Sequence, residues 1–337
     1  MRYRVYGLTL SSDAPVHELV PLAEAESEAQ SDVRVCFCSG RKKSFTPSPW
    51  FMSWTLPTGD LWLQCAKDGC GYLLRFPEIA DFFVDAEGRE IICAPEPETP
   101  METLRHLLLD QVLPLVLNLR GRDALHATAI LTPLGVCAFT GPAGTGKSTL
   151  AASFFRAGYP VLSDDCLVLE EDNRRILAIP AYPGLRLWED TLEALGENLS
   201  RSQPVAHYTS KKRLVLDSPL SDFSKGSYPL IRIYSLVRSD VNDANISLSS
   251  TIIERLSPRV AFMELIQTVF RLDINDRSML LRQFRFLERI VSRVPVRRLQ
   301  VPDALSSLPA VCEAILVDLN SRGDRLVDNN YTVPPSI

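Results

Sequence analysis

The stretch "FTGPAGTGKSTL", residues 139–150, decides what fold the chain is expected to have. Within it, Gly141–Ser148 fits the pattern G-x-x-x-x-G-K-[ST] without a mismatch. An apolar run, Val136–Phe139, leads into the loop, and residues 148–157 read as a helix that Gly158 closes. A strand, a glycine-rich loop and a helix in this order predict a site for nucleotide phosphates. A chance match in a glycine turn is the alternative.

Each residue type in this loop has a physical reason to be there. Glycines allow tight turns that aim several backbone N–H groups at one anion, and the helix N-terminus adds partial positive charge. Lys147 is expected to reach the β- and γ-phosphates, and Ser148 is expected to ligate Mg²⁺. The residues expected to contact the nucleotide are Gly141, Gly144, Thr145, Gly146, Lys147, Ser148 and Thr149.

Two adjacent aspartates follow in "LSDDCLVL", residues 162–169, a run that otherwise reads as a buried strand. Neighbouring strand residues point to opposite faces, so Asp164 and Asp165 cannot share a face of one continuous strand. We expect a parallel strand beside the one that feeds the loop, with both acids at its carboxyl end in the site crevice. A solvated turn at the end of the strand is the alternative.

His126, in "ALHATAI", is the third candidate. It precedes the loop on a strand that we expect to pair with the strand feeding the loop. A histidine there could orient a carboxylate or add positive charge beside phosphate oxygens. A hydrogen-bonded histidine in the core is the alternative.

His126, Lys147 and the Asp164–Asp165 pair together resemble the catalytic domain of bacterial HPr kinase/phosphorylase over residues 120–190. The resemblance implies a serine kinase that depends on ATP and Mg²⁺, with a fold distantly related to ATP-type phosphoenolpyruvate carboxykinase. It also implies that Asp164 is the base for the acceptor hydroxyl and that Asp165 and Ser148 hold the metal. The family's glutamate-containing segment has no counterpart, because "AIPAYPGLRLW" stands in its place.

The whole chain looks more like the HPr-kinase-related proteins encoded near peptide-modification genes. The segments that carry this resemblance include "YRVYGLTL", "DFFVDAEG", "SDDCLVL" and "AYPGLRLW". That group includes kinases of lasso-peptide precursors, which implies a peptide or protein acceptor with a serine, such as a precursor's C-terminal serine. Two alternatives stay open, a kinase for a small hydroxyl-bearing metabolite and a non-catalytic nucleotide-dependent binding module or ATPase.

Basic side chains from elsewhere in the chain commonly cover a transferring phosphoryl group. Arg186, in "PGLRLW", is one candidate for such a phosphate or acceptor contact, and a structural role is its alternative. The loop "HYTSKKR" supplies three more candidates, Lys211, Lys212 and Arg213, for which a solvated charged loop is the alternative.

The order of apolar runs and of turn and boundary residues along the chain predicts an α/β (α+β) protein with two parts and a tail. Residues 1–95 read as a β-rich module of short strands, and "APEPETP" at 94–100 marks the boundary. Residues 101–325 are expected to form the kinase-like domain, and 326–337 a disordered tail. A helix is expected over 100–120, bent near Pro114, with Thr99 as N-cap and Glu102 completing a capping box.

The bulk composition indicates an ordinary soluble protein of 337 residues, 46 % hydrophobic and 23 % charged. A net charge of −5 argues against nucleic acid as a general partner. We expect no membrane span, a cytoplasmic location with reduced thiols, and, by the resemblance, a homo-oligomer. Zinc is the alternative reading of four of the eight cysteines, Cys36, Cys38, Cys65 and Cys70.

Overall fold

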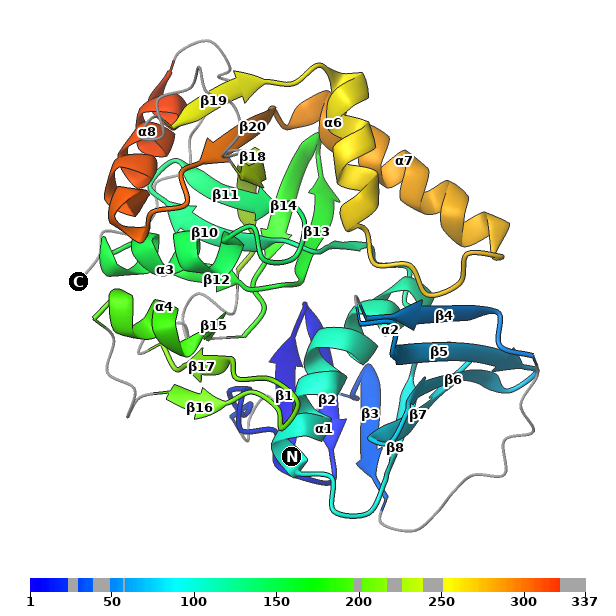
Figure 1. Ribbon diagram of the computed structural model, residues 1–337. Coiled ribbons are helices and arrows are strands. Elements are labelled where there is room, and N and C mark those ends of the chain that lie inside the picture. Colours follow the sequence, from blue (N-terminus) through cyan, green and yellow to red (C-terminus); the bar gives the residue numbers. More distant parts are fainter. Residues whose placement is uncertain are drawn as a thin grey trace. The chain divides into compact units, whose positions relative to one another are not determined.

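The structure is a computed structural model that describes residues 1–23, 30–38, 49–56, 58–182, 184–196, 202–216, 226–238 and 251–321 (Figure 1). The chain forms two compact units, and each is described by itself. The first unit contains Met1–Asp123, Pro204–Lys211 and Phe270–Leu280, and the second contains Ala124–Gln203, Lys212–Val269 and Leu281–Ile337. The tail expected over 326–337 lies outside the described residues.

The first unit is built on an eight-stranded sheet in the order β1-β2-β3-β8-β7-β6-β5-β4. Its pairs β2–β3 and β3–β8 are parallel and the others are antiparallel. The sequence had indicated a mostly antiparallel module here. The strands are β1 Arg2–Val5, β2 Leu8–Ser12, β3 Val33–Phe37, β4 Met52–Thr55, β5 Leu61–Asp68, β6 Gly71–Phe76, β7 Ala80–Asp85 and β8 Glu90–Pro95.

A buried helical segment follows β8 in the same unit, as α1 Met101–Leu107, the π-helical turn η2 Leu108–Val112 and α2 Leu113–Leu119. The wide turn lies just before Pro114, which has no N–H and would clash with a carbonyl four residues earlier in a regular helix. The structure therefore interrupts the regular α-helix just before Pro114, where the sequence predicts a bend.

Two expectations about this helical segment differ from the structure. The Thr99 capping box is wrong, because the Thr99 hydroxyl donates to the Ile79 carbonyl at 3.0 Å and Pro100 is the N-cap. The segment also belongs to the first unit and not to a domain that starts at residue 101. Arg105 pairs with Glu18 at 2.9 Å, which ties α1 to the N-terminal part of the chain.

The second unit has a nine-stranded sheet with the central order β12-β10-β11-β18-β14-β13-β9, extended from β18 by β20 and β19. Its strands are β9 Ala124–Leu125, β10 Thr128–Thr132, β11 Gly135–Thr140, β12 Val161–Ser163, β13 Leu167–Asp172, β14 Arg175–Ile179, β18 Tyr228–Arg238, β19 Ile252–Arg255 and β20 Val296–Val301. Three short strands form a separate sheet, β15 Leu185–Leu187, β16 Ser202–Pro204 and β17 Lys212–Leu214.

The helices after the first unit's α2 are α3 Lys147–Arg156, α4 Glu189–Ala194, α6 Pro258–Leu265, α7 Arg277–Arg293 and α8 Leu308–Asn320, with short 3-10 turns η4 Ile266–Thr268 and η5 Leu305–Ser307. Strand β11 is fully buried and supplies both faces of the sheet. Cys137 and Phe139 pack with α3 and α8, whereas Val136 and Ala138 pack in the cluster of α6 and α7. This burial explains the continuous apolar run before the loop.

Strand directions set the edge at which loops meet. Strands β11, β18 and β20 are mutually parallel, and β10 is antiparallel to both β11 and β12, so β12 runs in the same direction as β11. The expectation that β12 lies directly beside β11 is wrong, because β10 lies between them. The carboxyl ends of β11 and β12 nevertheless lie at the same edge, where β10 begins.

No described helix is both long and apolar enough to cross a membrane.

Replacing Gly71 by Ala is expected to destabilise the first unit by about 1–3 kcal/mol. Gly71 has a φ of +147°, and an added Cβ would lie 2.0 Å from the Val84 carbonyl oxygen on the neighbouring strand. Gly69→Ala is the matched control two residues away, because nothing lies within 4 Å of its added Cβ. Urea unfolding of both variants measures the difference. Equal losses would contradict the steric argument.

Candidate functional site

The glycine-rich loop joins β11 to α3, in the strand–loop–helix order that the sequence indicates. Gly141, Gly144 and Gly146 have φ values of +134°, +80° and +94°, a region that other residues rarely adopt. A Cβ on Gly141 would lie 2.7 Å from the Leu236 carbonyl oxygen, so this position also excludes a side chain by contact. Gly146 is the N-cap of α3 and has no side chain to cap it, so no N-cap side chain accepts a hydrogen bond from the first backbone N–H groups of the helix.

Lys147 is folded onto its own loop. Its buried ammonium group donates to the carbonyl oxygens of Gly141 at 2.9 Å and Pro142 at 3.1 Å. The Thr145 hydroxyl also donates to the Pro142 oxygen, at 2.9 Å. Thr149 lies on the first turn of α3, after Ser148. The Lys147 charge therefore already sits over the loop, held by neutral oxygens that an anion could replace.

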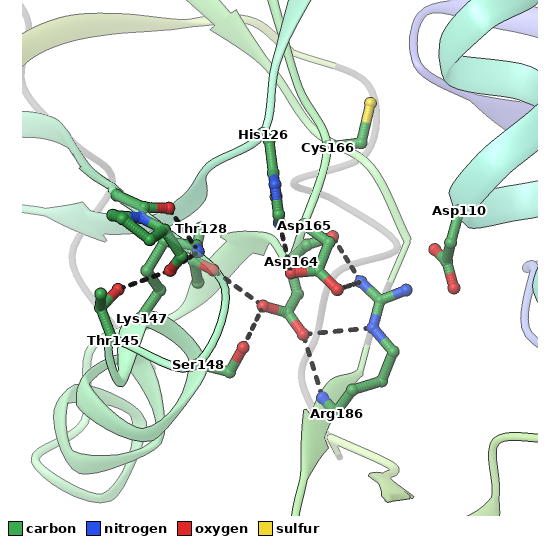
Figure 2. A network of polar contacts seen from close by, with 12 residues as sticks. Asp110, His126, Thr128, Thr145, Lys147, Ser148, Asp164, Asp165, Cys166 and Arg186 are labelled. Atoms are coloured by element: carbon green, nitrogen blue, oxygen red, sulfur yellow. Dashed lines mark hydrogen bonds and ion pairs between the residues drawn. The ribbon is translucent and has the colours of Figure 1, made fainter. Parts of the chain in front are cut away.

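The aspartate pair lies in a break between two strands, which answers how two adjacent acids can reach one place. Strand β12 ends at Ser163 and β13 begins at Leu167, so neither aspartate is constrained by strand alternation. Asp165 has a φ of +64°, a left-handed conformation that aspartate adopts more readily than most residues. The side chains of Asp164 and Asp165 both face the neighbouring Arg186 (Figure 2).

Asp164 accepts hydrogen bonds through both of its carboxylate oxygens (Figure 2). Its Oδ1 accepts hydrogen bonds from the hydroxyls of Ser148 at 2.9 Å and Thr128 at 2.8 Å. Its Oδ2 accepts from the Arg186 backbone N–H at 3.0 Å and faces Arg186 Nε at 3.4 Å. Ser148 is therefore bonded to Asp164, whereas the resemblance had grouped Ser148 with Asp165.

Arg186, on β15, braces both acids. Its Nη2 donates to the Asp164 carbonyl at 2.6 Å and lies 3.4 Å from Asp165 Oδ2. Its Nη1 donates to the Tyr182 hydroxyl at 3.3 Å, and the Arg186 side chain is only 3 % exposed. Such burial and these partners fit a structural support for the acids better than a direct contact with an acceptor.

The other three basic candidates, Lys211, Lys212 and Arg213, have different surroundings in the structure. Arg213 is buried and lies over the Tyr182 ring, 5.4 Å from its centroid, so it supports Arg186 indirectly. Lys212 pairs with Glu189 at 3.2 Å. Lys211 lies in the first unit.

His126 lies in the break between β9 and β10 and not within a continuous strand. Its side chain is 39 % exposed, and Nε2 lies 3.4 Å from Asp165 Oδ1. Its backbone N–H donates to the Thr268 carbonyl at 2.6 Å, which fixes the break against the segment after α6. The alternative of a core histidine is therefore wrong.

Burial is the main cause that raises the pKa of Asp164, and the Asp165 charge raises it further. The charge of Arg186 and the hydrogen bonds from Arg186 and Thr128 act in the opposite direction without cancelling the effect. The site thus holds a carboxylate whose negative charge is undercompensated, a property common at functional sites.

Thr128 and Tyr182 are site residues that sequence reasoning missed. Thr128 carried a signal, because it follows His126 by two residues and β10 begins there, at the edge that carries the loop. Tyr182 carried none, because its hydroxyl reaches the site only through Arg186.

The cysteine pairs considered for zinc do not form a metal site in the part of the chain that the structure describes. No group of three or more His, Cys, Asp or Glu side chains there is arranged to hold a metal by itself. Cys65 is buried, and burial raises the pKa of its thiol to about 12, which keeps it protonated.

Comparisons with known proteins yield a distant structural likeness and no family. No protein-family model matches the chain, and no curated protein matches it. Among solved structures, the chain is similar to the HPr(Ser) kinase/phosphatase from Coxiella burnetii, with a TM-score of 0.31 and 13 % sequence identity. That similarity covers 58 % of this chain and 96 % of the other. A likeness of this size assigns no activity, so the functional argument rests on the residues described above.

The raised pKa of Asp164 predicts how stability depends on pH. Because the folded pKa lies above the unfolded value, the contribution of Asp164 to stability is complete below about pH 4 and is lost as pH rises through the folded pKa. Asp164→Asn lacks this titration. The melting temperature of the variant minus that of the unaltered protein is expected to increase from pH 4 to pH 8, measured calorimetrically in EDTA. A difference that falls with pH would mean that pairing with Arg186 outweighs burial.

Proposed function

We propose that the protein is an ATP- and Mg²⁺-dependent kinase that transfers the γ-phosphoryl group to a serine hydroxyl of a peptide or protein. One observation carries the proposal. Asp164 Oδ1 accepts a hydrogen bond at 2.9 Å from the hydroxyl of Ser148, the residue that follows the loop lysine in the sequence. A motif serine, the loop lysine and a pair of carboxylates at one sheet edge are the parts that phosphoryl transfer requires.

The donor set fits Mg²⁺. Ser148 and the aspartates offer only oxygen ligands, which this cation prefers. Its charge would offset the two carboxylates, in a site where burial and then the Asp165 charge raise the pKa of Asp164. Among the described residues no cluster of three or more acidic, histidine or cysteine groups could hold a metal unaided. Few protein ligands are typical of Mg²⁺ sites completed by phosphate oxygens and water. Ser148 and Asp164 would hold the ion, which supplies charge neutralisation at the transferring group.

The roles of the two acids follow from their surroundings. Asp164 is 3 % exposed and is bonded through both oxygens to Ser148, Thr128 and Arg186. Asp165 is more open, with a side chain 28 % exposed, and faces His126. We therefore assign Asp165 as the base and Asp164 as the metal carboxylate, the reverse of what the family resemblance implies.

The chain's residues then act in a defined order. Lys147 exchanges the Gly141 and Pro142 carbonyls for phosphate oxygens. His126 keeps the Asp165 carboxylate directed at the acceptor. As the serine Oγ bonds to the γ-phosphorus and the bond to the β–γ bridging oxygen breaks, the hydroxyl proton passes to Asp165 and ADP leaves.

The two alternatives predict different products. A small-metabolite kinase would use the same groups, and a non-catalytic module would retain only the loop. Against a non-catalytic module, the single charge of Arg186 does not balance two neighbouring carboxylates, which would repel phosphate unless Mg²⁺ were also held there.

Asp165→Asn is expected to lower kcat by about 10²- to 10⁴-fold while Mg²⁺-dependent ATP binding persists, because it removes only the base. Asp164→Asn is expected to weaken ATP binding in Mg²⁺ but not in EDTA. Radiolabel transfer from γ-labelled ATP and titration with a fluorescent ATP analogue measure the two effects. Asp172→Asn, an exposed strand carboxylate, is the control. The opposite pattern would restore Asp164 as the base.

The acceptor class is tested by offering γ-labelled ATP and Mg²⁺ with peptides that end in serine, the same peptides ending in alanine, and small hydroxyl compounds. Label on the serine peptides alone is expected. Label on a small compound would favour the metabolite kinase, and free phosphate alone an ATPase.

A further inference from the structure

A second basic side chain, Arg238, stands at the glycine-rich loop. Its Nη2 donates to the Gly144 carbonyl oxygen at 2.6 Å, across 94 residues of sequence. No motif marks Arg238, because it is the last residue of the ordinary-looking strand β18. It therefore does not belong to the groups already assigned to the site.

The sheet brings Arg238 to this position. Strand β18 pairs in parallel with β11, with Ser235 opposite Thr140, so both strands end at the same edge. The loop then begins at Gly141, whose backbone packs against that of Leu236. Arg238 lies two residues after Leu236 on the same strand. Central sheet pairing thus holds the Cα of Arg238 beside the loop.

The charge of Arg238 forms only a long, exposed ion pair. Its side chain is 61 % exposed, and its ion-pair partner Asp303 is 3.8 Å away and 60 % exposed. Exposed pairs of this kind contribute little. The buried Arg186, by contrast, is engaged by both acids. A guanidinium has five donors in a planar fork, and one bond to a neutral carbonyl uses a fraction of them.

We propose that Arg238 is a second cationic contact for the nucleotide phosphates, complementing Lys147. The inference rests on the proposed nucleotide site and extends it to β18. Like Lys147, Arg238 donates a hydrogen bond to a carbonyl oxygen of the loop. It exchanges this neutral oxygen for phosphate oxygens when the nucleotide binds. A guanidinium can bind phosphate through two parallel hydrogen bonds.

The test measures the dissociation constant of a fluorescent ATP analogue in Mg²⁺, with no acceptor and so without turnover. Arg238→Gln removes the charge and is too short to reach the Gly144 carbonyl as arginine does, and it is expected to weaken binding roughly tenfold. Arg238→Lys keeps the charge without the fork and is expected to fall in between. Asp303→Asn, which releases Arg238 from its acid, is expected to tighten binding slightly.

Arg259→Gln, an exposed arginine on α6, is the matched control, and Lys147→Ala is the reference for loss of the loop. If Arg238→Gln binds within about twofold of the unaltered protein while Lys147→Ala loses binding, the role of Arg238 is overturned and the nucleotide site stands. If Lys147→Ala also binds normally, the proposed function fails with it.

Discussion

The buried carboxylate of Asp164 is the interaction on which the site depends. Burying a charge is unfavourable unless hydrogen bonds and an opposite charge accompany it, and three separate elements supply them. Thr128 comes from β10, Ser148 from α3 and Arg186 from β15, while the carboxylate itself comes from the break after β12. Losing any one of these partners would leave the buried carboxylate with fewer hydrogen bonds.

Interrupted strands are the means by which the fold delivers these groups. His126 lies between β9 and β10, and Asp164 and Asp165 lie between β12 and β13. In a continuous strand, successive side chains would point alternately into the apolar layers on the two faces of this sheet. Residues in the breaks do not follow that alternation. The flanking strands still hold the backbone of these residues at the edge of the sheet where β11 ends and the glycine-rich loop begins.

Local signals predicted the local features. The strand–loop–helix order around residues 139–150 follows from a short motif, and the structure has it where the sequence indicated. The expectation of continuous strands at residues 162–169 and around His126 is wrong, because both runs are broken at the candidate residues. The other failures are non-local. Thr99 found a tertiary partner in Ile79 instead of capping its helix. The insertion of β10 between β11 and β12 depends on sheet order. Arg186 could be recognised as a brace only from its burial.

Hydrogen-bond capacity separates the two acids more firmly than their order in the sequence does. Both oxygens of Asp164 already accept bonds from side-chain hydroxyls or the Arg186 backbone, so an acceptor's proton would have to displace one of them. In the proposed function, the Ser148 hydroxyl oxygen and Asp164 would hold the cation, whose charge would offset that of the buried carboxylate. Asp165, partly exposed between His126 and Arg186, can take up a proton without dismantling the support of its neighbour. Arg186 therefore contacts both acids, and under the proposed assignment it supports Asp164 as the metal carboxylate and Asp165 as the base.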